Sequence, residues 1–315
     1  MDSVSVIGAG LIGRAWAITF ARAGCRVRLW DPVPSAIPEA MDYIASVADD
    51  LVRNDLAGGR DRDTLLKAIE GRDTLTAALE GASWVQECGP ERIETKRETF
   101  ARLDASADPD AILASSSSAL LPSAISEGLA GRRRCVVAHP INPPYLVPAV
   151  ELVPAPWTDA GIMDRAAAFL RGIGQVPLVM EREIDGFIMN RLQGALLDEA
   201  FRLVEGGYAS AADVDRGIAD GIALRWSFIG PFETIDLNAP AGIADYVARY
   251  GPMYARLADS MRRQPDWAAI TAGGIEAERR AALPAERLSD RQRWRDARLM
   301  ALRARKRNAD AQFGN

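Results

Sequence analysis

Hydrophobic and polar positions near the start of the chain predict a strand, a helix and a second strand in succession. Residues 3–7 form an apolar run, residues 12–23 are rich in alanine with helical spacing, and residues 26–30 alternate in the manner of a strand. Gly24 ends the helix. The pattern therefore predicts one strand–helix–strand unit with parallel strands.

Strands and helices continue to alternate over the next 150 residues. The region 35–80 predicts helices, and a helix at 91–105 separates two strands. The further predicted strands cover 83–87, 111–115, 134–138, 149–153 and 175–180. This alternation indicates an α/β fold with a mostly parallel sheet that is covered by helices on both faces.

The pattern changes at Asp185-Gly186. Residues 186–206 are strongly helical, and the chain beyond them predicts only helices and loops. We therefore expect an α/β domain over 1–185 and an all-helical domain over 186–315. The Arg-rich segment 286–307, which contains Trp294, is expected to be a solvated helix.

Composition and charge exclude several classes of protein. The chain of 315 residues has a formal net charge of −5 and a pI near 5.2, which argues against a nucleic-acid-binding surface. No run of 18 or more apolar residues is present, so no membrane span is expected. The three cysteines are too scattered for a disulfide framework or a metal site. Cys25 and Cys135 lie in apolar runs and are expected to be buried thiols, which fits a cytoplasmic protein.

A glycine-rich turn follows the first strand. Gly8, Gly10 and Gly13 have the spacing G-x-G-x-x-G, with Leu11 and Ile12 between the last two. This spacing alone is a weak signal, but a strand precedes it and a helix follows it, as in Rossmann-type dinucleotide-binding domains. The helix N-terminus would offer free N–H groups to the phosphates of the cofactor.

Asp31 ends the second strand, 18 residues after Gly13. A carboxylate there can accept hydrogen bonds from the adenosine ribose and would repel a 2′-phosphate. The next residues, Pro32-Val33-Pro34-Ser35, supply no cation for such a phosphate. NAD is therefore favoured over NADP, while a turn without ligand and an FAD site are the less favoured alternatives.

His139 is the only histidine of the chain, and it follows an apolar strand. A dehydrogenase that acts on an alcohol needs a base near neutral pH, and imidazole meets that need. Glu151 lies twelve residues later in an otherwise apolar run, where a carboxylate needs a partner. We expect Glu151 to orient His139, although each residue alone also has a structural interpretation.

Two further polar features have open interpretations. Asn190 falls on the apolar stripe of the helix that begins the second domain, and its amide is either bonded to nearby backbone or available to a ligand. The run Ser115–Ser118 follows a strand and is either a polar loop or a source of hydroxyls for a substrate.

These residues together resemble the 3-hydroxyacyl-CoA dehydrogenase family over almost the whole chain. The motifs that match are GAGLIG, the serine cluster that ends at Ser118, the HPINP segment from His139, Glu151, and the helix that starts GFIMNRL. The resemblance implies that His139 is the base and Glu151 its partner. It also implies that Ser118 and Asn190 bind substrate or cofactor, and that Asn142 lies beside the nicotinamide.

Within the family, the chain looks most like the L-gulonate 3-dehydrogenase/lambda-crystallin branch. The segments HPINPPYLVPAVELVP, LRWSFIGP, DLNA and RWRD carry this similarity, and carnitine dehydrogenases and diketoreductases share part of it. The Arg-Trp pair before Gly230-Pro231 departs from the acyl-CoA members, which favours a small free 3-hydroxy acid as substrate.

Arg225 of that pair is then a candidate for holding the substrate carboxylate, and an ion pair with Glu233 or Asp236 is its structural alternative. The substrate alternatives are carnitine and a 3-hydroxyacyl-CoA, for which Arg132–Arg134 would offer cations. A third alternative is an NAD-binding structural protein of the crystallin kind. The resemblance also implies a homodimer formed through the helical domain.

The cofactor assignment gives a first prediction. The enzyme should use NAD with a much higher kcat/KM than NADP, because Asp31 repels the 2′-phosphate. Asp31→Ser combined with Pro32→Arg should narrow that preference. Steady-state kinetics with both cofactors test it, and equal kcat/KM values for the wild type would show the assignment to be wrong.

Overall fold

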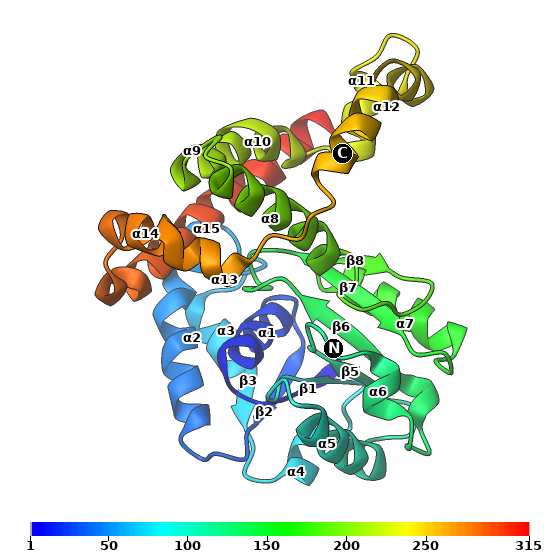
Figure 1. The fold of residues 1–315 in the computed structure, drawn as a ribbon. Coiled ribbons are helices and arrows are strands. Elements are labelled where there is room, and N and C mark those ends of the chain that lie inside the picture. Colours follow the sequence, from blue (N-terminus) through cyan, green and yellow to red (C-terminus); the bar gives the residue numbers. More distant parts are fainter. Residues whose placement is uncertain (1, 315) are drawn as a thin grey trace. The chain divides into compact units, whose positions relative to one another are not determined.

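The computed structural model describes residues 2–314 and begins with the predicted strand–helix–strand unit (Figure 1). Strand β1 (Ser3–Ile7) is buried along its whole length, and helix α1 (Leu11–Arg22) and strand β2 (Arg26–Trp30) follow it. β1 and β2 pair in parallel, with Ile7 opposite Trp30. The unit therefore places the glycine turn at the carboxyl ends of two parallel strands.

The strands of the described chain form one eight-stranded sheet, in the order β3-β2-β1-β4-β5-β6-β7-β8. The later strands are β3 (Ile69–Gly71), β4 (Trp84–Glu87), β5 (Ile112–Ser115), β6 (Cys135–Pro140), β7 (Ala149–Pro154) and β8 (Val176–Val179). All neighbouring strands are parallel except β6 and β7, which are antiparallel. The predicted mostly parallel sheet is confirmed.

Two predicted strand assignments need correction. The region 35–80 contains the edge strand β3 besides helices, and its three residues, of which only Ile69 is buried, are too few to show an alternation. β6 does not end before His139 but continues to Pro140, because its last residues pair with β7. His139 is therefore a residue of the sheet rather than of a loop.

Helices cover both faces of the sheet, as predicted. On one face lie α1, α2 (Ala36–Arg53), α3 (Arg62–Lys67) and α7 (Ala160–Gly172), and on the other lie α4 (Leu75–Leu79), α5 (Ile93–Ser106) and α6 (Pro122–Ser126). Stacked aromatic rings fill the first core, with the ring centroids of Trp84 and Phe169 4.6 Å apart. Cys25 and Cys135 are buried as expected, and burial raises the pKa of the Cys135 thiol to about 12.

The chain divides into two compact units. The first contains the residues up to Met189 together with Arg295–Arg305, and the second contains Asn190–Trp294 together with the residues from Lys306 on. The later helices are α8 (Met189–Glu205), α9 (Ala211–Arg216), α10 (Ala223–Trp226), α11 (Pro231–Leu237), α12 (Ile243–Ser260), α13 (Trp267–Ile270), α14 (Glu276–Ala282) and α15 (Leu288–Phe313). Short 3₁₀ or π turns occupy Arg132–Arg134, Gly217–Ile222, Thr271–Ile275 and Ala285–Arg287.

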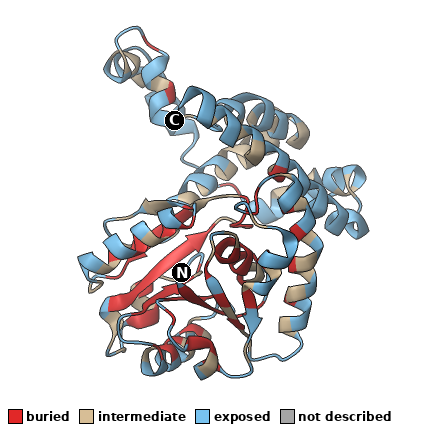
Figure 2. Cartoon of the chain, turned by 180° about the vertical axis from the view of Figure 1, so that it is seen from behind, coloured by how far each residue is buried: buried red, intermediate tan, exposed pale blue. Residues whose placement is uncertain are grey.

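Burial differs sharply between the two units (Figure 2). Strands β1 and β4–β7 of the first unit are almost completely buried, whereas Asn190–Trp294 contains only three buried residues, Thr234, Ala239 and Pro265. Correspondingly, the predicted apolar stripe of α8 from Asn190 to Phe201 is only half-buried. Segment 295–305 of α15 packs on the first unit, where Met300 joins the core of the α1 face. None of the helices within residues 2–314 is long and apolar enough to cross a membrane.

Candidate functional site

The geometry of the glycine turn requires glycine at two of its positions. Gly8 has a φ of +106°, and a Cβ there would lie 2.9 Å from the carbonyl carbon of Cys88. A Cβ at Gly13 would lie 1.8 Å from the carbonyl oxygen of Gly8, so only glycine lets α1 start this close to the strand. A Cβ at Gly10 would meet nothing within 4 Å. The space beside Gly10 is therefore open to a ligand.

The N-terminus of α1 is free of competing side chains. No side chain caps it, and its first turn contains no acidic residue. The first N–H groups of a helix have no acceptor within the helix, and the positive end of its dipole favours an anion. These features fit the phosphates of a dinucleotide.

Asp31 lies beside this turn. Its Oδ2 accepts a hydrogen bond from the N–H of Ala9 at 2.7 Å, and its Oδ1 accepts one from the N–H of Val33 at 2.8 Å. Each oxygen keeps a second lone pair for a further donor. The two backbone bonds thus fix the carboxylate at the end of β2, where the sequence predicts the ribose.

His139 and Glu151 face each other directly across the antiparallel pair β6–β7. Residues opposite one another in such a pair point to the same side of the sheet. The Nδ1 of His139 lies 2.6 Å from the Oε2 of Glu151, and both residues are buried. The sheet register therefore brings together the two residues that the sequence pairs.

The second carboxylate oxygen of Glu151 accepts hydrogen bonds from the backbone at the start of α8. Its Oε1 accepts hydrogen bonds from the N–H groups of Ile188 at 2.6 Å and Met189 at 2.7 Å. Gly186 and Phe187 precede these residues with φ values of +76° and +48°. A left-handed phenylalanine is strained, and the turn persists because Phe187 is fully buried beside the ring of His139.

Glu151 is held in its ionised form. Burial raises its pKa, but the hydrogen bonds from His139, Met189 and Ile188, together with the charge that His139 carries when it is protonated, outweigh this, and the pKa lies below its ordinary value. An ionised Glu151 accepts the Nδ1 proton of neutral His139. The Nε2, which has no hydrogen-bond partner among residues 2–314, is then the basic nitrogen.

The serine run begins with Ser115, the last residue of β5, and continues into the loop that follows the strand. Ser115 donates to Glu87 Oε2 at 2.7 Å, Ser116 accepts from Gln86 at 2.8 Å, and Ser117 donates to Glu91. Ser118 is exposed, and its N–H donates to Glu91 Oε1 at 3.0 Å. The side chains of Ser115, Ser116 and Ser117 therefore make structural hydrogen bonds, Ser115 within β5 and the other two in the loop after it.

Sequence reasoning missed the acids that organise this edge of the sheet. Glu91 also accepts the N–H of Ala119 at 3.0 Å, and Glu87 forms a buried ion pair with Lys96 at 2.9 Å. Burial raises the pKa of Glu91, but the Ser117 hydroxyl, the loop N–H groups and Lys96 bring it below its ordinary value. Helical spacing could have revealed Lys96, because it shares the buried face of α5 with Phe100 and Leu103.

Asn142 lies just after β6. Its side-chain Oδ1 is buried and has no hydrogen-bond partner in the described chain. A buried acceptor without a donor is costly, so it indicates a missing ligand or water. The unsatisfied Oδ1 of Asn142 is consistent with a position of this side chain beside a bound cofactor.

Asn190 and Arg225 belong to the helical unit. Asn190 is the second residue of α8 and is half-buried. Arg225 is exposed on α10 and lines an open pocket of about 630 Å³ with Ile222, Leu224 and Phe228. It forms no ion pair with Glu233 or Asp236. The ion pair expected in the structural alternative for Arg225 is therefore not formed.

Arg132–Arg134 lie far from His139 in the structure. They precede β6, and with a rise of about 3.3 Å per residue Arg134 is about 17 Å from His139 along the strand. Arg133 pairs with Asp159 at 3.2 Å and Arg134 with Asp104 at 3.0 Å. The suggestion that this cluster binds the phosphates of CoA is not supported.

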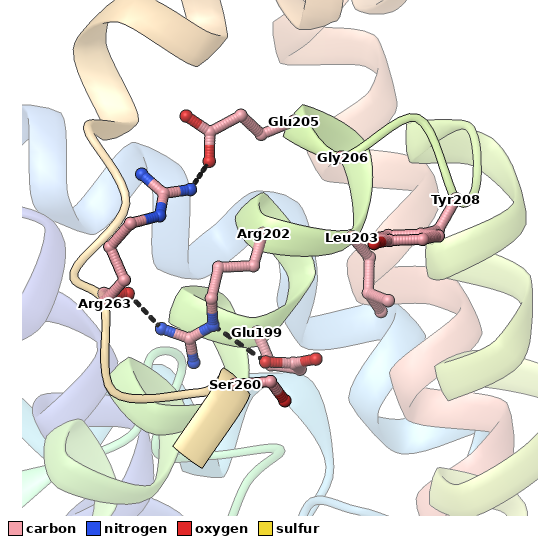
Figure 3. A pocket seen from close by; sticks show the side chains of 8 residues that line it. All are labelled: Glu199, Arg202, Leu203, Glu205, Gly206, Tyr208, Ser260 and Arg263. Carbon is pink, nitrogen blue, oxygen red and sulfur yellow. Dashed lines mark hydrogen bonds and ion pairs between the residues drawn. The ribbon is translucent and has the colours of Figure 1, made fainter. Parts of the chain in front are cut away.

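A pocket of about 560 Å³ in the helical unit is a weaker candidate site (Figure 3). Arg202 on α8 pairs with Glu199 at 2.8 Å, and Arg263 pairs with Glu205. Both guanidinium groups are thus neutralised by carboxylates within the pocket. The pocket therefore offers no unpaired positive charge from these two arginines to an anionic ligand.

Comparison with known proteins decides the family. Residues 3–184 match the model of the 3-hydroxyacyl-CoA dehydrogenase NAD-binding domain, and residues 186–273 match that of the 3-hydroxyacyl-CoA dehydrogenase C-terminal domain. The chain belongs to the 3-hydroxyacyl-CoA dehydrogenase family. It is accordingly an NAD-dependent oxidoreductase that acts on CH–OH groups.

Individual proteins resemble the chain over most of its length. A lambda-crystallin homolog from Bos taurus is 46% identical over 302 residues, which cover 95% of this chain and 94% of the relative. An L-carnitine dehydrogenase from Streptomyces coelicolor is 37% identical over 279 residues, covering 87% and 86%. The crystal structure of 5-formyl-3-hydroxy-2-methylpyridine 4-carboxylic acid 5-dehydrogenase, an NAD⁺-dependent dismutase, matches with a TM-score of 0.83 at 25% identity, covering 96% and 97%.

The buried charge of Glu151 predicts how this dehydrogenase responds to acid. Its lowered pKa contributes stability above the unfolded pKa of about 4.3, and that stability is lost as the pH falls through the folded pKa. Glu151→Gln removes charge-assisted hydrogen bonds and should cost about 1.5–3 kcal/mol at pH 7. Its Tm should also fall less steeply than that of the wild type as the pH is lowered from about 5 to about 3.5.

Thermal melts over this range check the prediction. Glu80→Gln, at an exposed position after α4, is the matched control and should follow the wild-type curve. If the curve for Glu151→Gln ran parallel to the wild-type curve, the buried charge would contribute nothing to the pH dependence.

Proposed function

We propose that this enzyme oxidises the 3-hydroxyl of a small free 3-hydroxy acid, similar to L-gulonate, to the 3-keto acid, with His139 as general base. The observation that supports this most is the 2.6 Å contact between His139 Nδ1 and Glu151 Oε2. It directs the basic Nε2 away from Glu151, where a substrate hydroxyl can approach.

In the proposed reaction, His139 Nε2 takes the proton of the substrate hydroxyl. Bound NAD supplies the acceptor for the hydride that leaves the same carbon. The imidazolium that forms is stabilised by the ionised Glu151, which also keeps the ring in one tautomer. Reduction of a 3-keto acid follows the reverse path, with His139 donating the proton.

The residues that would hold the cofactor surround the glycine turn. The N–H groups of Leu11, Ile12 and Gly13 would bind the phosphates, and the open space at Gly10 would admit them. Asp31 would accept the ribose hydroxyls, and Asn142 would meet the nicotinamide end through its orphan oxygen. Ser118 and Asn190 are proposed to bind substrate or cofactor, as their positions in the family motifs imply.

A free acid is favoured over a CoA thioester by the placement of cations. Arg132–Arg134 lie at the opposite end of β6 from His139 and include two arginines that pair with carboxylates, whereas Arg225 has no carboxylate partner in the described chain. The solved relative with a TM-score of 0.83 is named for a carboxylic acid substrate. Arg225 is thus the proposed carboxylate ligand.

L-Carnitine is the second candidate substrate, because one relative of 37% identity is an L-carnitine dehydrogenase and carnitine is itself a free 3-hydroxy acid. A structural role is the third candidate, suggested by the lambda-crystallin names. NADH formation with L-gulonate, L-3-hydroxybutyrate, L-carnitine and 3-hydroxybutyryl-CoA separates the three. Turnover of the thioester alone would overturn the free-acid proposal, and no turnover of any compound would favour the structural role.

His139 gives the test of the proposed chemistry. His139→Gln should lower kcat by roughly 100-fold or more, within the range for loss of a general base, while NADH binding stays nearly unchanged. Single-turnover rates and fluorescence titration with NADH measure the two effects. A variant that kept more than about a tenth of the wild-type rate of the chemical step would remove His139 from this role.

Arg225 gives the test of the proposed substrate class. Arg225→Met should lower kcat/KM for the free acid about ten- to a hundredfold, because a charge-assisted contact is worth about 1.5–3 kcal/mol, and should spare the methyl ester. Arg249→Met is the matched control, since Arg249 already pairs with Asp245 at 2.6 Å. Equal losses for acid and ester would make Arg225 a structural residue.

We also propose that the enzyme is a homodimer assembled through its helical unit. Large apolar side chains of this unit are unusually exposed in the single chain, including Leu224 at 66%, Phe232 at 75%, Leu237 at 68% and Val247 at 55%. A monomeric protein rarely exposes so much apolar surface in one region. A second copy of the chain would cover it.

Light scattering at micromolar concentration should therefore give twice the chain mass of 34.1 kDa. Val247→Glu should shift the mass towards the monomer, because it would bury a charge in the contact. Val52→Glu, at an exposed position of α2, should leave the dimer intact. A wild type of single-chain mass would contradict the proposal.

A further inference from the structure

Arg14 directly follows Gly13 and lies in the first turn of α1. It lies four residues after Gly10 and so shares a helix face with it, about 6 Å further along the axis. Side chains on a helix tilt back towards its N-terminus. The stem of Arg14 therefore begins below the open space that a Cβ at Gly10 would enter.

An aromatic ring supports the guanidinium group. The Cζ of Arg14 lies 3.7 Å from the ring centroid of Tyr43 on α2, and the Tyr43 hydroxyl is 2.8 Å from that of Tyr145. Stacking uses the flat face of a guanidinium and leaves the N–H groups at its edge available as donors. Tyr43 thus holds the cation without satisfying its hydrogen bonds.

The donors of the Arg14 side chain lack acceptors within the described residues. Its Nε is buried without a hydrogen-bond partner, and within residues 2–314 no carboxylate forms an ion pair with its guanidinium. The buried Arg134, in contrast, pairs with Asp104 at 3.0 Å. Arg14 is therefore a cation that still needs an anion.

The position of this cation is unfavourable unless an anion binds. The N-terminus of a helix carries partial positive charge, which repels a cation in the first turn. α1 has no acidic residue in that turn to offset the repulsion. A dianionic pyrophosphate at the helix N-terminus would reverse the sign of the interaction.

We propose that Arg14 binds the pyrophosphate of the cofactor, adding a charged side-chain donor to the backbone N–H groups of the glycine turn. The pyrophosphate would accept hydrogen bonds from the edge of the guanidinium while its face stays on Tyr43. The proposal concerns the cofactor alone and does not depend on which acid is the substrate.

Binding of cofactor fragments to the whole enzyme tests this assignment. ADP carries the pyrophosphate and adenosine does not, and both can be titrated by competition with NADH fluorescence. Arg14→Met should weaken ADP and NADH about ten- to a hundredfold and leave adenosine within about twofold. Arg14→Lys should recover part of the affinity, because it restores the charge without the planar donor group.

Two controls separate binding from packing. Tyr43→Phe keeps the ring and loses only the contact with Tyr145, so ADP affinity should not change, whereas Tyr43→Leu removes the support and should weaken ADP several-fold. The Tm of Arg14→Met without ligand should equal or exceed that of the wild type, because a repelled cation is removed.

The outcomes are distinct. Loss of ADP affinity with adenosine unchanged supports the proposal. An unchanged affinity for ADP would overturn the proposal, whether or not the KM of the acid substrate rises. An equal loss of affinity for ADP and for adenosine would also overturn it. If Arg14→Met does not fold, Arg14→Gln, which keeps a polar side chain, gives the same comparison.

Discussion

The carboxylate of Glu151 is the constraint on which the rest of the site depends. It is fully buried and accepts three hydrogen bonds, one from His139 and two from the backbone of Ile188 and Met189. A buried charge is tolerated only when its lone pairs are used in this way. The same group therefore fixes the imidazole, ends the strained Gly186–Phe187 turn and sets the start of α8.

Sheet topology makes this arrangement available. If β7 ran parallel to β6, a crossover of a dozen or more residues would separate His139 from its partner strand. The antiparallel pair instead places Glu151 opposite His139 after a connection of eight residues, from Ile141 to Pro148. One reversal in an otherwise parallel sheet thus provides the His–Glu pair.

Several cationic side chains form ion pairs within the protein, whereas two arginines are proposed to pair with anionic ligands. Asp104, Asp159 and Glu87 neutralise cations within the first unit, and Glu199 and Glu205 do so within the helical unit. Arg14 and Arg225 have no such partner among residues 2–314. These two cations lie on the cofactor-binding helix and in an apolar pocket, where anionic ligands are proposed to bind.

Much of this was predictable from the sequence, because the signals are local. The glycine spacing, the apolar runs and a single carboxylate inside one of them predicted the turn, the strands and the partner of His139. Other features depend on contacts between distant residues. Glu91 binds a loop 27 residues away, and segment 295–305 packs on a core formed by the first half of the chain. No periodicity in one segment reports such contacts, and the apolar stripe of α8 likewise does not reveal that this face is only half-buried.

The tautomer of His139 tests the central claim most directly. The chain contains one histidine, so ¹⁵N-labelled imidazole in a protein without a histidine tag gives the spectrum of this residue alone. With Glu151 ionised and bound to Nδ1, neutral His139 should carry its proton on Nδ1, and Nε2 should show the shift of an unprotonated nitrogen. A ring protonated on Nε2 at a pH where it is neutral would contradict the account, because that nitrogen could not act as the base.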